Sequence, residues 1–381
     1  MVRDRESASF DVIVVGLGGM GSAAAYHLAR RGLSVLGLER FTVPHDFGSS
    51  HGESRIIRLA YFEHPDYVPL LRRSYELWRS LQSEAGESLL VATGSLDASG
   101  VGQGVFDESL ESCRVHGIDH EVLTAAEVST RFPGVRLPSD AMAVFQADGG
   151  FLRPDRCVVA HVEGAKRAGA VVQTGERVLG IDEVGDGVEV TTDQGRYRAG
   201  RVVVTAGPWA SELIGASELL SVERQVLLWV APLKPEDYVP ECFPVFNIRG
   251  DLGHYYGFPL TGPSGVKLGK YHHLEEVVDP DTVDRETHPE DEAAMRAFLA
   301  AVLPGANGEQ AGMKTCLFTN TPDEHFIVGP LPGASRVIVG AGFSGHGFKF
   351  ASAIGETLSD LACDQAPSAE IRFLSMDRFA S

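Results

Sequence analysis

Cysteine is scarce in this chain of 381 residues. The five cysteines stand at positions 113, 157, 242, 316 and 363, without the close spacing of zinc ligands or of a disulfide framework. We therefore expect no metal site and no structural disulfide. Each cysteine is interpreted first as a small buried residue.

Basic residues are also in short supply, because 33 lysines and arginines face 52 aspartates and glutamates, for a net charge of -19. Such a charge repels phosphate backbones and anionic membrane surfaces, so we expect neither nucleic acid nor a membrane as partner. The first apolar run, residues 12–15, is far shorter than a signal-peptide core or a membrane span. These absences predict a cytoplasmic protein. An anionic substrate would need a local cluster of arginine and lysine.

The length of the chain exceeds the size at which one hydrophobic core usually stops growing. Hydrophobic residues make up 44% of the sequence and charged residues 22%, which is typical of a globular protein. We therefore expect two domains.

A dinucleotide-binding motif opens the chain. A β-branched run at residues 10–15 leads into a glycine-rich turn that includes Gly16, Gly18 and Gly21, and a helix of small residues follows. The first glycine permits the tight turn, the second lets the backbone approach a pyrophosphate, and the third lets the helix pack on the strand. A second strand ends in Glu39, whose carboxylate can accept hydrogen bonds from ribose hydroxyls. The motif predicts a dinucleotide and leaves FAD and NAD both open.

Further elements follow from hydrophobic spacing and turn residues. Residues 170–207 read as successive strands with a β-meander, which is typical of flavin-binding folds rather than of simple NAD dehydrogenases. A buried strand at 336–342 closes on glycines, and short strands are expected around Tyr255 and Val266. Helices are predicted at 65–82, 154–168, 289–302 and 351–363.

Four long motifs occur in order along the chain: residues 49–58, residues 267–269, residues 316–326 and residues 342–350. With these motifs the chain resembles the family of monomeric sarcosine oxidase and N-methyltryptophan oxidase, flavoenzymes that oxidise N-methyl amino acids. The resemblance covers nearly the whole length. It implies an α/β fold in which a Rossmann-like FAD-binding domain is interrupted by a β-sheet substrate-binding domain.

The expected domains are discontinuous. Residues 1–90, 150–220 and 316–381 are assigned to the FAD-binding domain. Residues 91–149 and 221–315 are assigned to the substrate-binding domain, which is expected to be α+β.

The resemblance changes the interpretation of Cys316. A lone cysteine is more often a small buried residue. The resemblance implies instead that Cys316 attaches FAD covalently, through a thioether to the 8-methyl group of the isoalloxazine. Because a thiolate is the nucleophile for such a bond, a positive environment is expected around it. The resemblance also assigns to the cofactor Ser49, Ser50, Val178 and Gly342.

Two arginines lie in an apolar stretch, Arg55 and Arg58, and an arginine there needs an anionic partner. The resemblance implies that Arg58 and Lys349 clamp the substrate carboxylate, since the arginine fork binds a carboxylate bidentately and lysine adds a point charge. It places Arg55 beside the flavin, where its charge would favour the anionic reduced state.

Four more residues acquire roles from the resemblance. Lys267 would lie over the flavin ring and stabilise the charge that develops on oxygen. His346 is assigned near flavin and substrate as an electrostatic or hydrogen-bonding group, and Tyr256 and Phe318 are assigned to the substrate cavity. Phe318 replaces a tyrosine of sarcosine oxidase, and the segment 270–273 is longer than its counterpart there. The side chain of the substrate therefore stays open.

The resemblance predicts an oxidase of N-methyl or other secondary amino acids. The product imine yields an aldehyde or remains as a cyclic imine, dioxygen becomes hydrogen peroxide, and the protein is a monomer. One alternative is an FAD-dependent dehydrogenase that passes electrons to another acceptor. The other is a nucleotide-binding module without turnover.

Overall fold

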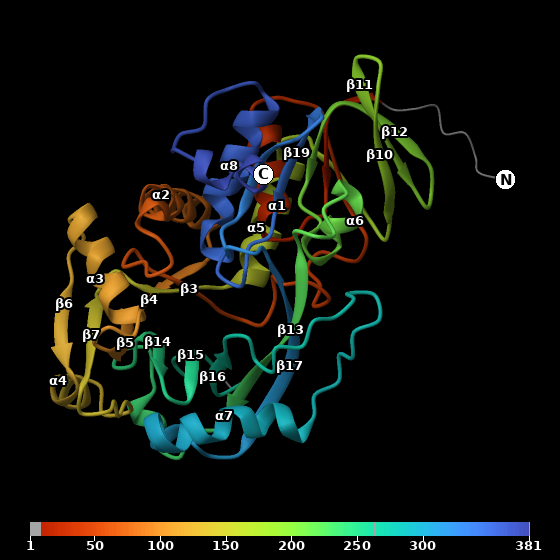
Figure 1. Cartoon of the computed structure of the whole chain (residues 1–381). Helices are drawn as coiled ribbons and strands as arrows, with labels where there is room; N and C mark the ends of the chain where they lie inside the picture. Colours follow the sequence, from red (N-terminus) through yellow and green to blue (C-terminus); the bar gives the residue numbers. More distant parts are fainter. Residues whose placement is uncertain (1–8, 263, 381) are drawn as a thin grey trace.

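A computed structural model describes residues 9–262 and 264–380. Within these residues, two eight-stranded sheets and a small three-stranded sheet form the framework (Figure 1). Residues 1–8, with which the first predicted domain segment begins, lie outside the described part. No helix among the described residues is both long and apolar enough to cross a membrane.

The first large sheet contains the dinucleotide motif. Its six-strand path, from one edge to the other, is β10 (Val178–Val184), β11 (Gly187–Thr192), β12 (Arg196–Val204), β1 (Ser9–Val15), β2 (Val35–Glu39) and β9 (Val171–Thr174). The strands β12, β1, β2 and β9 run parallel. Parallel strands need helical crossovers, which cover the faces of a sheet, and β2, the end of β1 and the end of β12 are accordingly buried, whereas the edge strand β9 is partly exposed.

Strand β12 pairs with β1 along one edge and with two strands, one after the other, along its second edge. Its first half pairs antiparallel with β11, which completes the meander expected between 170 and 207. Its second half pairs in parallel with β19 (Ala334–Ala341), and β18 (Ile327–Leu331) lies antiparallel to β19. The chain therefore returns to the first sheet after the whole second sheet has been built.

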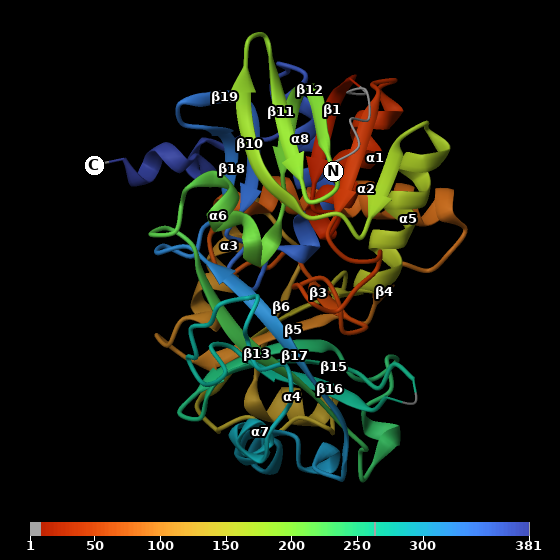
Figure 2. The ribbon, with the colours of Figure 1, turned by 90° about the vertical axis from the view of Figure 1, so that its right-hand side faces the viewer.

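Helices of the first sheet pack closely because small residues face one another. A β-carbon added to Gly355 would lie 2.4 Å from the β-carbon of Ala23, so two helices meet at nearly backbone contact there. Figure 2 shows α1, α2 and α5 on the same side of the sheet. The helices of this half are α1 (Gly19–Arg30), α2 (Val68–Ala85), α5 (Pro154–Arg167), α6 (Ala210–Ile214) and α8 (Ala351–Ala362).

The second large sheet has the order β17 (Gln310–Asn320), β13 (Ser221–Val230), β16 (Val266–Lys270), β15 (Gly253–Phe258), β14 (Val245–Gly250), β5 (Ser95–Gly100), β7 (Ala141–Gln146) and β6 (Glu121–Thr124). All neighbours are antiparallel except β14 and β5. Its helices are α3 (Val105–His116), α4 (Ala125–Arg131) and α7 (Pro289–Val302).

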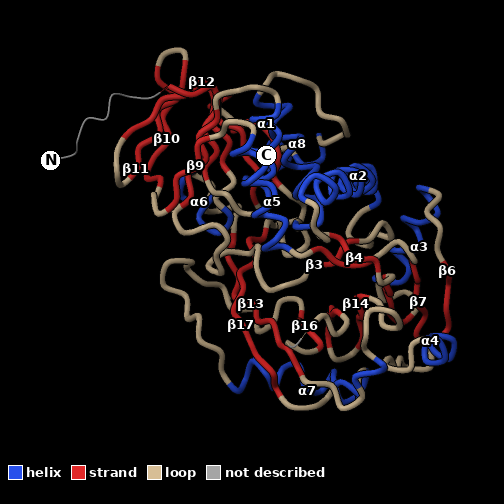
Figure 3. Tube along the Cα trace, turned by 180° about the vertical axis from the view of Figure 1, so that it is seen from behind, coloured by secondary structure: helices blue, strands red, loops and turns tan. Residues whose placement is uncertain are grey.

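The two faces of this sheet differ because side chains alternate along each strand. One face is apolar and packs on α7, where Tyr255 stacks on Phe298 with ring centroids 4.1 Å apart. Figure 3 shows α7 on one side of these strands and β3 and β4 on the other. The register places a polar and aromatic set on the opposite face: Asp97, Asn247, Tyr256, Lys267 and Cys316.

A three-stranded sheet lies between the two large ones (Figure 1). Its order is β3 (Arg55–Ile57), β8 (Gly150–Leu152) and β4 (Leu90–Ala92). Single turns of 3-10 helix occur at Pro65–Tyr67, Gly207–Trp209, Pro235–Asp237, Pro304–Ala306, Phe348–Phe350, Arg372–Leu374 and Met376–Phe379.

The domain division stays a prediction, although the elements can be placed against it. Strands β5, β6 and β7 come from 91–149, and β13 to β16 come from 221–315. The predicted boundary at residue 316 falls inside β17, which pairs with β13 from Gln310 to Asn320. A boundary inside a continuous strand was not visible from the local pattern.

Candidate active site and cofactor cavity

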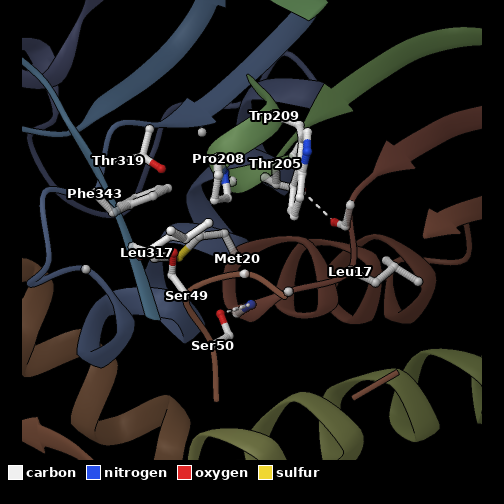
Figure 4. A pocket seen from close by; sticks show the side chains of 18 of the residues that line it. Leu17, Met20, Ser49, Ser50, Thr205, Pro208, Trp209, Leu317, Thr319 and Phe343 are labelled. Carbon is white, nitrogen blue, oxygen red and sulfur yellow. Dashed lines mark hydrogen bonds between the residues drawn. The ribbon is translucent and has the colours of Figure 1, made fainter. Parts of the chain in front are cut away.

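A long cavity lies between the first sheet and the polar face of the second. It begins at the glycine turn after β1 and ends at His346 and Lys349. Figure 4 shows that its wall is built from segments far apart in sequence, among them Leu17, Ser49, Trp209 and Leu317. The cavity also includes, of the residues predicted for the site, Gly16, Gly18, Glu39, Ser50, Arg55, Val178, Phe318 and Gly342.

The glycine turn has the geometry that a pyrophosphate site needs. Gly16 has φ +85°, a conformation that favours glycine, and a β-carbon on Gly21 would lie only 1.8 Å from the carbonyl oxygen of Gly16. Helix α1 begins at Gly19 with no capping side chain and no acidic residue in its first turn. Apart from the Gly19 amide, which donates to Ser50 Oγ, its N-terminal amides and its dipole are therefore available to an anion. Gly21 serves packing and does not line the cavity.

Glu39 ends β2 at the rim of the same cavity. Its carboxylate accepts hydrogen bonds from the backbone amides of Leu17, at 2.8 Å, and Phe41, at 3.0 Å. A carboxylate can accept about four hydrogen bonds, so capacity for ribose hydroxyls remains. These two amides hold the carboxylate in place next to the turn.

Residues at the far end of this rim were missed by the sequence analysis. Trp209 and Arg40 line the cavity, and both donate to Asp281, at 2.7 and 2.6 Å. Arg177 donates to the same carboxylate at 3.2 Å. No local pattern marks this cluster, because Asp281 lies in the long connection between β16 and α7.

The segment after β2 reaches both sides of the cavity. Ser50 Oγ accepts a hydrogen bond from the Gly19 amide at 3.1 Å, and Ser49 Oγ donates to the Leu317 carbonyl at 2.5 Å. Gly342 has φ +62°, and a β-carbon there would lie 2.4 Å from Thr321 Cγ2. The serines thus tie the helix start to β17, and the glycine allows the loop after β19 to approach.

Cys316 and Arg55 lie side by side, although 261 residues separate them in sequence. The distance from Arg55 Nη2 to Cys316 Sγ is 3.7 Å, and Cys316 is buried. Arg55 also donates to the carbonyl oxygens of Ser54 and Ser49, each at 2.9 Å. A fixed cation next to the thiol is the environment expected for a nucleophilic cysteine.

Lys267 points from β16 toward the loop before β3. Its Nζ donates to the carbonyl oxygens of Gly52 and Ser54, both at 2.7 Å, which favours the protonated amine. Burial and the charge of Arg55 lower the pKa of Lys267 well below its usual range. Its ammonium lies 4.4 Å from the ring centroid of Phe258. The charge state of Lys267 therefore depends on its neighbours. This residue does not line the cavity.

His346 has a defined tautomer. Its Nε2 faces the carbonyl oxygen of Glu324 at 3.0 Å, and a carbonyl can only accept. Nε2 must therefore carry the hydrogen, and Nδ1 accepts from the hydroxyl of Tyr61. Burial lowers the pKa of His346 to about 4, with the Lys349 charge acting in the same direction. The imidazole is neutral near pH 7.

Arg58 is held by two carboxylates that the sequence analysis did not foresee. Its Nε donates to Asp97 Oδ2 at 3.0 Å and its Nη2 to Glu63 Oε2 at 2.9 Å. The guanidinium also lies over the Phe62 ring, with its central carbon 4.3 Å from the centroid. Burial opposes the charge, but Glu63 and Asp97 raise the pKa of Arg58 above its usual value. The anionic partner that the apolar surroundings demanded is supplied by the chain itself.

Lys349 lies at the inner end of the cavity. Its Nζ donates to the carbonyl oxygen of His346 at 2.7 Å. Burial lowers the pKa of Lys349 to about 7, against the opposing influence of Glu63. The protonated and neutral forms of Lys349 are therefore about equally populated at neutral pH, where an added anion would favour the protonated form.

Aromatic rings surround this end. Tyr271, the residue after β16, stacks on His254 at 4.4 Å between ring centroids. It also lies 5.2 Å from Tyr256 and 6.0 Å from Phe318. Sequence reasoning assigned Tyr256 and Phe318 but not Tyr271 or His254. Apart from Phe318, these rings do not line the cavity.

The predicted site residues thus fall into two groups. The cavity wall contains Arg55, Phe318, His346 and Lys349 together with the cofactor residues named above. Behind it, and outside the wall, are Arg58, Tyr256, Lys267 and Cys316. The described residues contain no group of three or more histidines, cysteines or carboxylates arranged to hold a metal. The roles of all these residues remain predictions.

Comparison with known proteins identifies the family. Residues 11–361 match the family described as FAD dependent oxidoreductase. The chain belongs to this family.

Relatives of this FAD-dependent oxidoreductase extend over its full length. It is 41% identical to a monomeric sarcosine oxidase of Bacillus sp. (strain B-0618), over 98% of this chain and 97% of the relative. It is 34% identical to the human peroxisomal sarcosine oxidase, over 98% and 97%. It is 35% identical to the N-methyl-L-tryptophan oxidase of Yersinia pestis (strain Pestoides F), over 97% and 99%.

Solved structures of amino acid oxidoreductases have a similar fold. NikD, described as an unusual amino acid oxidase essential for nikkomycin biosynthesis, superposes with a TM-score of 0.84 at 28% identity, over 97% of this chain and 98% of that one. The L-proline dehydrogenase of P. horikoshii has the same fold, with a TM-score of 0.84 at 22% identity over 98% of each chain. The interrupted Rossmann-like architecture is therefore that of an FAD-dependent oxidoreductase.

Proposed function

We propose that this protein is an oxidase of N-methyl or other secondary amino acids, which uses covalently bound FAD and reduces dioxygen to hydrogen peroxide. One observation carries the proposal: a single cavity joins the dinucleotide turn at Gly16 to His346 and Lys349. The full-length relatives with sarcosine and N-methyl-L-tryptophan in their names support it. We further propose that the protein is a monomer and works in the cytoplasm.

The residues present fit FAD. The uncapped start of α1 and the close approach at Gly21 suit a diphosphate. Glu39 and Val178 line the same cavity, and they would contact the adenosine. Cys316 Sγ, with Arg55 Nη2 at 3.7 Å, would be the sulfur joined to the 8-methyl carbon. Bound FAD supplies the two-electron oxidation, since no protein side chain here carries such a group.

The chain's own residues bind and orient the amino acid. Arg58 and Lys349 would hold its carboxylate, the first by a planar fork and the second by a point charge. The neutral His346 offers no positive charge near the substrate nitrogen, which suits an amine that must lose its proton before oxidation. Lys267, when protonated, would place a cation near reacting dioxygen and would stabilise the charge that develops on oxygen.

Two measurements test the proposal. A peroxide assay over N-methyl amino acids, proline and pipecolate should find turnover with at least one of them. Substrate-dependent flavin reduction without reoxidation by dioxygen in stopped flow would indicate a dehydrogenase instead. A colourless protein as purified, which gains no absorbance with added FAD, would refute both.

The covalent linkage is tested separately. After acid precipitation, yellow colour should stay with the pellet of the wild-type protein and move to the supernatant for Cys316→Ser. Cys113→Ser is the matched control, because Cys113 is equally buried but lies in α3 away from the cavity. Release of colour from the wild-type protein would refute the linkage and leave the oxidase proposal intact.

A further inference from the structure

Asp97 is a buried carboxylate on the same face of the second sheet as Lys267 and Tyr256. We propose that Asp97 is a positioning residue for substrate recognition, which fixes the Nε edge of Arg58 so that the terminal nitrogens of the guanidinium meet the substrate carboxylate. The inference rests on the proposed function, because it assumes that Arg58 binds this carboxylate.

The surroundings of Asp97 are built to hold it still. Its Oδ2 accepts from Arg58 Nε at 3.0 Å and from Ser109 Oγ at 2.9 Å, and its Oδ1 accepts from Asn247 Nδ2 at 2.8 Å. Only 1% of Asp97 is exposed. The three donors come from β14, α3 and the segment after β3, so three elements fix this one carboxylate. Strand alternation sends its neighbours Leu96 and Ala98 into the opposite, apolar core.

The attachment at Nε leaves a defined edge of Arg58 for a ligand. Arg58 Nη1 has no hydrogen-bond partner in the described part of the chain, and Nη2 has only Glu63. Glu63 is the less firmly held carboxylate, since its Oε1 has no hydrogen-bond partner among the described residues and lies 4.0 Å from His346 Nδ1. The guanidinium is planar, so fixing Nε and packing one part on Phe62 also fixes the direction of both terminal nitrogens.

Charge gives Asp97 a second effect on the same site. Arg58 and Lys349 contribute two cations, and Asp97 and Glu63 contribute two anions. Burial lowers the pKa of Lys349, whereas the Glu63 and Asp97 carboxylates raise it, and Arg58 lowers it further. Loss of the Asp97 charge would therefore leave the Arg58 guanidinium less firmly oriented. It would also leave Lys349 less protonated. Both changes weaken the binding of a carboxylate.

The test is Asp97→Asn in the holoenzyme. Asparagine is isosteric, and Asn247 can rotate its amide to accept where it now donates. We expect KM for the best secondary amino acid to rise about tenfold. The Kd for methoxyacetate, an ether that lacks the amine of N-methylglycine, should rise by a similar factor. The rate of anaerobic flavin reduction at saturation should change less than about twofold, because Asp97 touches no reacting atom.

A double-mutant cycle shows whether Asp97 acts through Arg58. In the Arg58→Met background, Asp97→Asn should change Kd for methoxyacetate by less than about twofold. An equal effect in both backgrounds would overturn the inference, as would an unchanged KM in Asp97→Asn. If Arg58→Met alone leaves Kd and KM unchanged, the carboxylate clamp of the proposed function fails instead.

Two variants guard against a merely structural effect. Ser109→Ala keeps the charge of Asp97 but removes one of its donors, so a smaller rise of KM in the same direction is expected. Asp291→Asn breaks another buried pair, with Arg224, whose carboxylate and guanidinium lie 2.9 Å apart. It should lower thermal stability without raising KM. A rise of KM in Asp291→Asn equal to that in Asp97→Asn would refute the specific role.

Discussion

The hydroxyl of Tyr61 donates to Nδ1 of His346, and this hydrogen bond leaves the ring proton on Nε2. Burial favours the neutral ring, whose pKa is lowered to about 4. We expect ¹⁵N-labelled histidine spectra to show one neutral, Nε2-protonated histidine that does not titrate between pH 5.5 and pH 8, a signal identified by its loss in His346→Asn. A transition of this signal near its ordinary pKa of about 6.5 would contradict the buried, neutral assignment.

Tyr61→Phe removes the donor to Nδ1 and leaves the bond from Nε2 to Glu324. The tautomer should persist, and the catalytic rate should fall about two- to tenfold, because an orphaned buried acceptor costs about 1–3 kcal/mol and part of that cost falls on the oriented ring. Tyr67→Phe is the control, since Tyr67 packs on the same histidine but bonds to His325. An equal loss of catalytic rate in both variants would show that the effect comes from packing and not from the hydrogen bond to Nδ1.

Binding of carboxylates should weaken as pH rises through the pKa of Lys349, which is about 7. The protonated amine attracts the anion, so Kd for methoxyacetate should be constant below pH 6 and increase up to about tenfold per unit above pH 8. In Lys349→Met the increase should vanish. Methoxyacetate has no amine, so the titration of the ligand does not interfere. A pH dependence that survives in Lys349→Met would assign it to another group.

His272 bridges two carboxylates from different segments of the chain. Its ring lies between Glu223 of β13, at 2.7 Å, and Glu324 of the loop after β17, at 3.2 Å. These hydrogen bonds raise the pKa of His272 to about 10, above its unfolded value of 6.5. The stabilisation is therefore complete below pH 6.5 and is lost as pH rises toward 10.

We accordingly expect His272→Gln to lower the melting temperature at pH 6 and to match the wild-type protein at pH 10.5. Thermal unfolding at several pH values measures this. His64→Gln serves as the control, because His64 is also partly exposed but lies 3.7 Å from a single exposed aspartate. A difference that is independent of pH would place the effect outside the ion pair.

Gly21→Ala should abolish the dinucleotide turn. The added β-carbon would lie 1.8 Å from the Gly16 carbonyl oxygen and 2.4 Å from Thr205 Oγ1, and a backbone atom cannot yield cheaply. We expect the variant to contain less than about a tenth of the wild-type FAD. Its free energy of unfolding should fall by several kcal/mol, as at other overpacked sites. Gly195→Ala is the control, since nothing lies within 4 Å of its β-carbon. Normal flavin content in Gly21→Ala would contradict this packing.

Local elements were accessible from the sequence. The strand, glycine turn, helix and Glu39 lie within 31 residues. The strand predicted at 10–15 is β1, Ser9–Val15, and the predicted helix of small residues and the second strand ending at Glu39 occur as α1 and β2. The helix expected at 289–302 is α7, residue for residue. Short-range hydrogen bonds and hydrophobic spacing govern such elements, so their pattern is readable without the fold.

The neighbours of Arg58 were not accessible in this way. Its apolar flanks required an anionic partner, and the substrate was the expected one. Asp97 is 39 residues away and reaches Arg58 because β5 joins the second sheet beside β14, in a register that turns Asp97 to the site face. A lone aspartate in a strand gives only a weak local signal, namely a charge flanked by Leu96 and Ala98.

The order of residues alone therefore dictates the nucleotide turn and most strands and helices, because each depends on neighbours a few positions away. The meeting of Arg55 with Cys316, the second carboxylate on Arg58 and the neutral state of His346 come from folding, because desolvation and Coulomb forces act over a few ångströms of space whatever the separation along the chain.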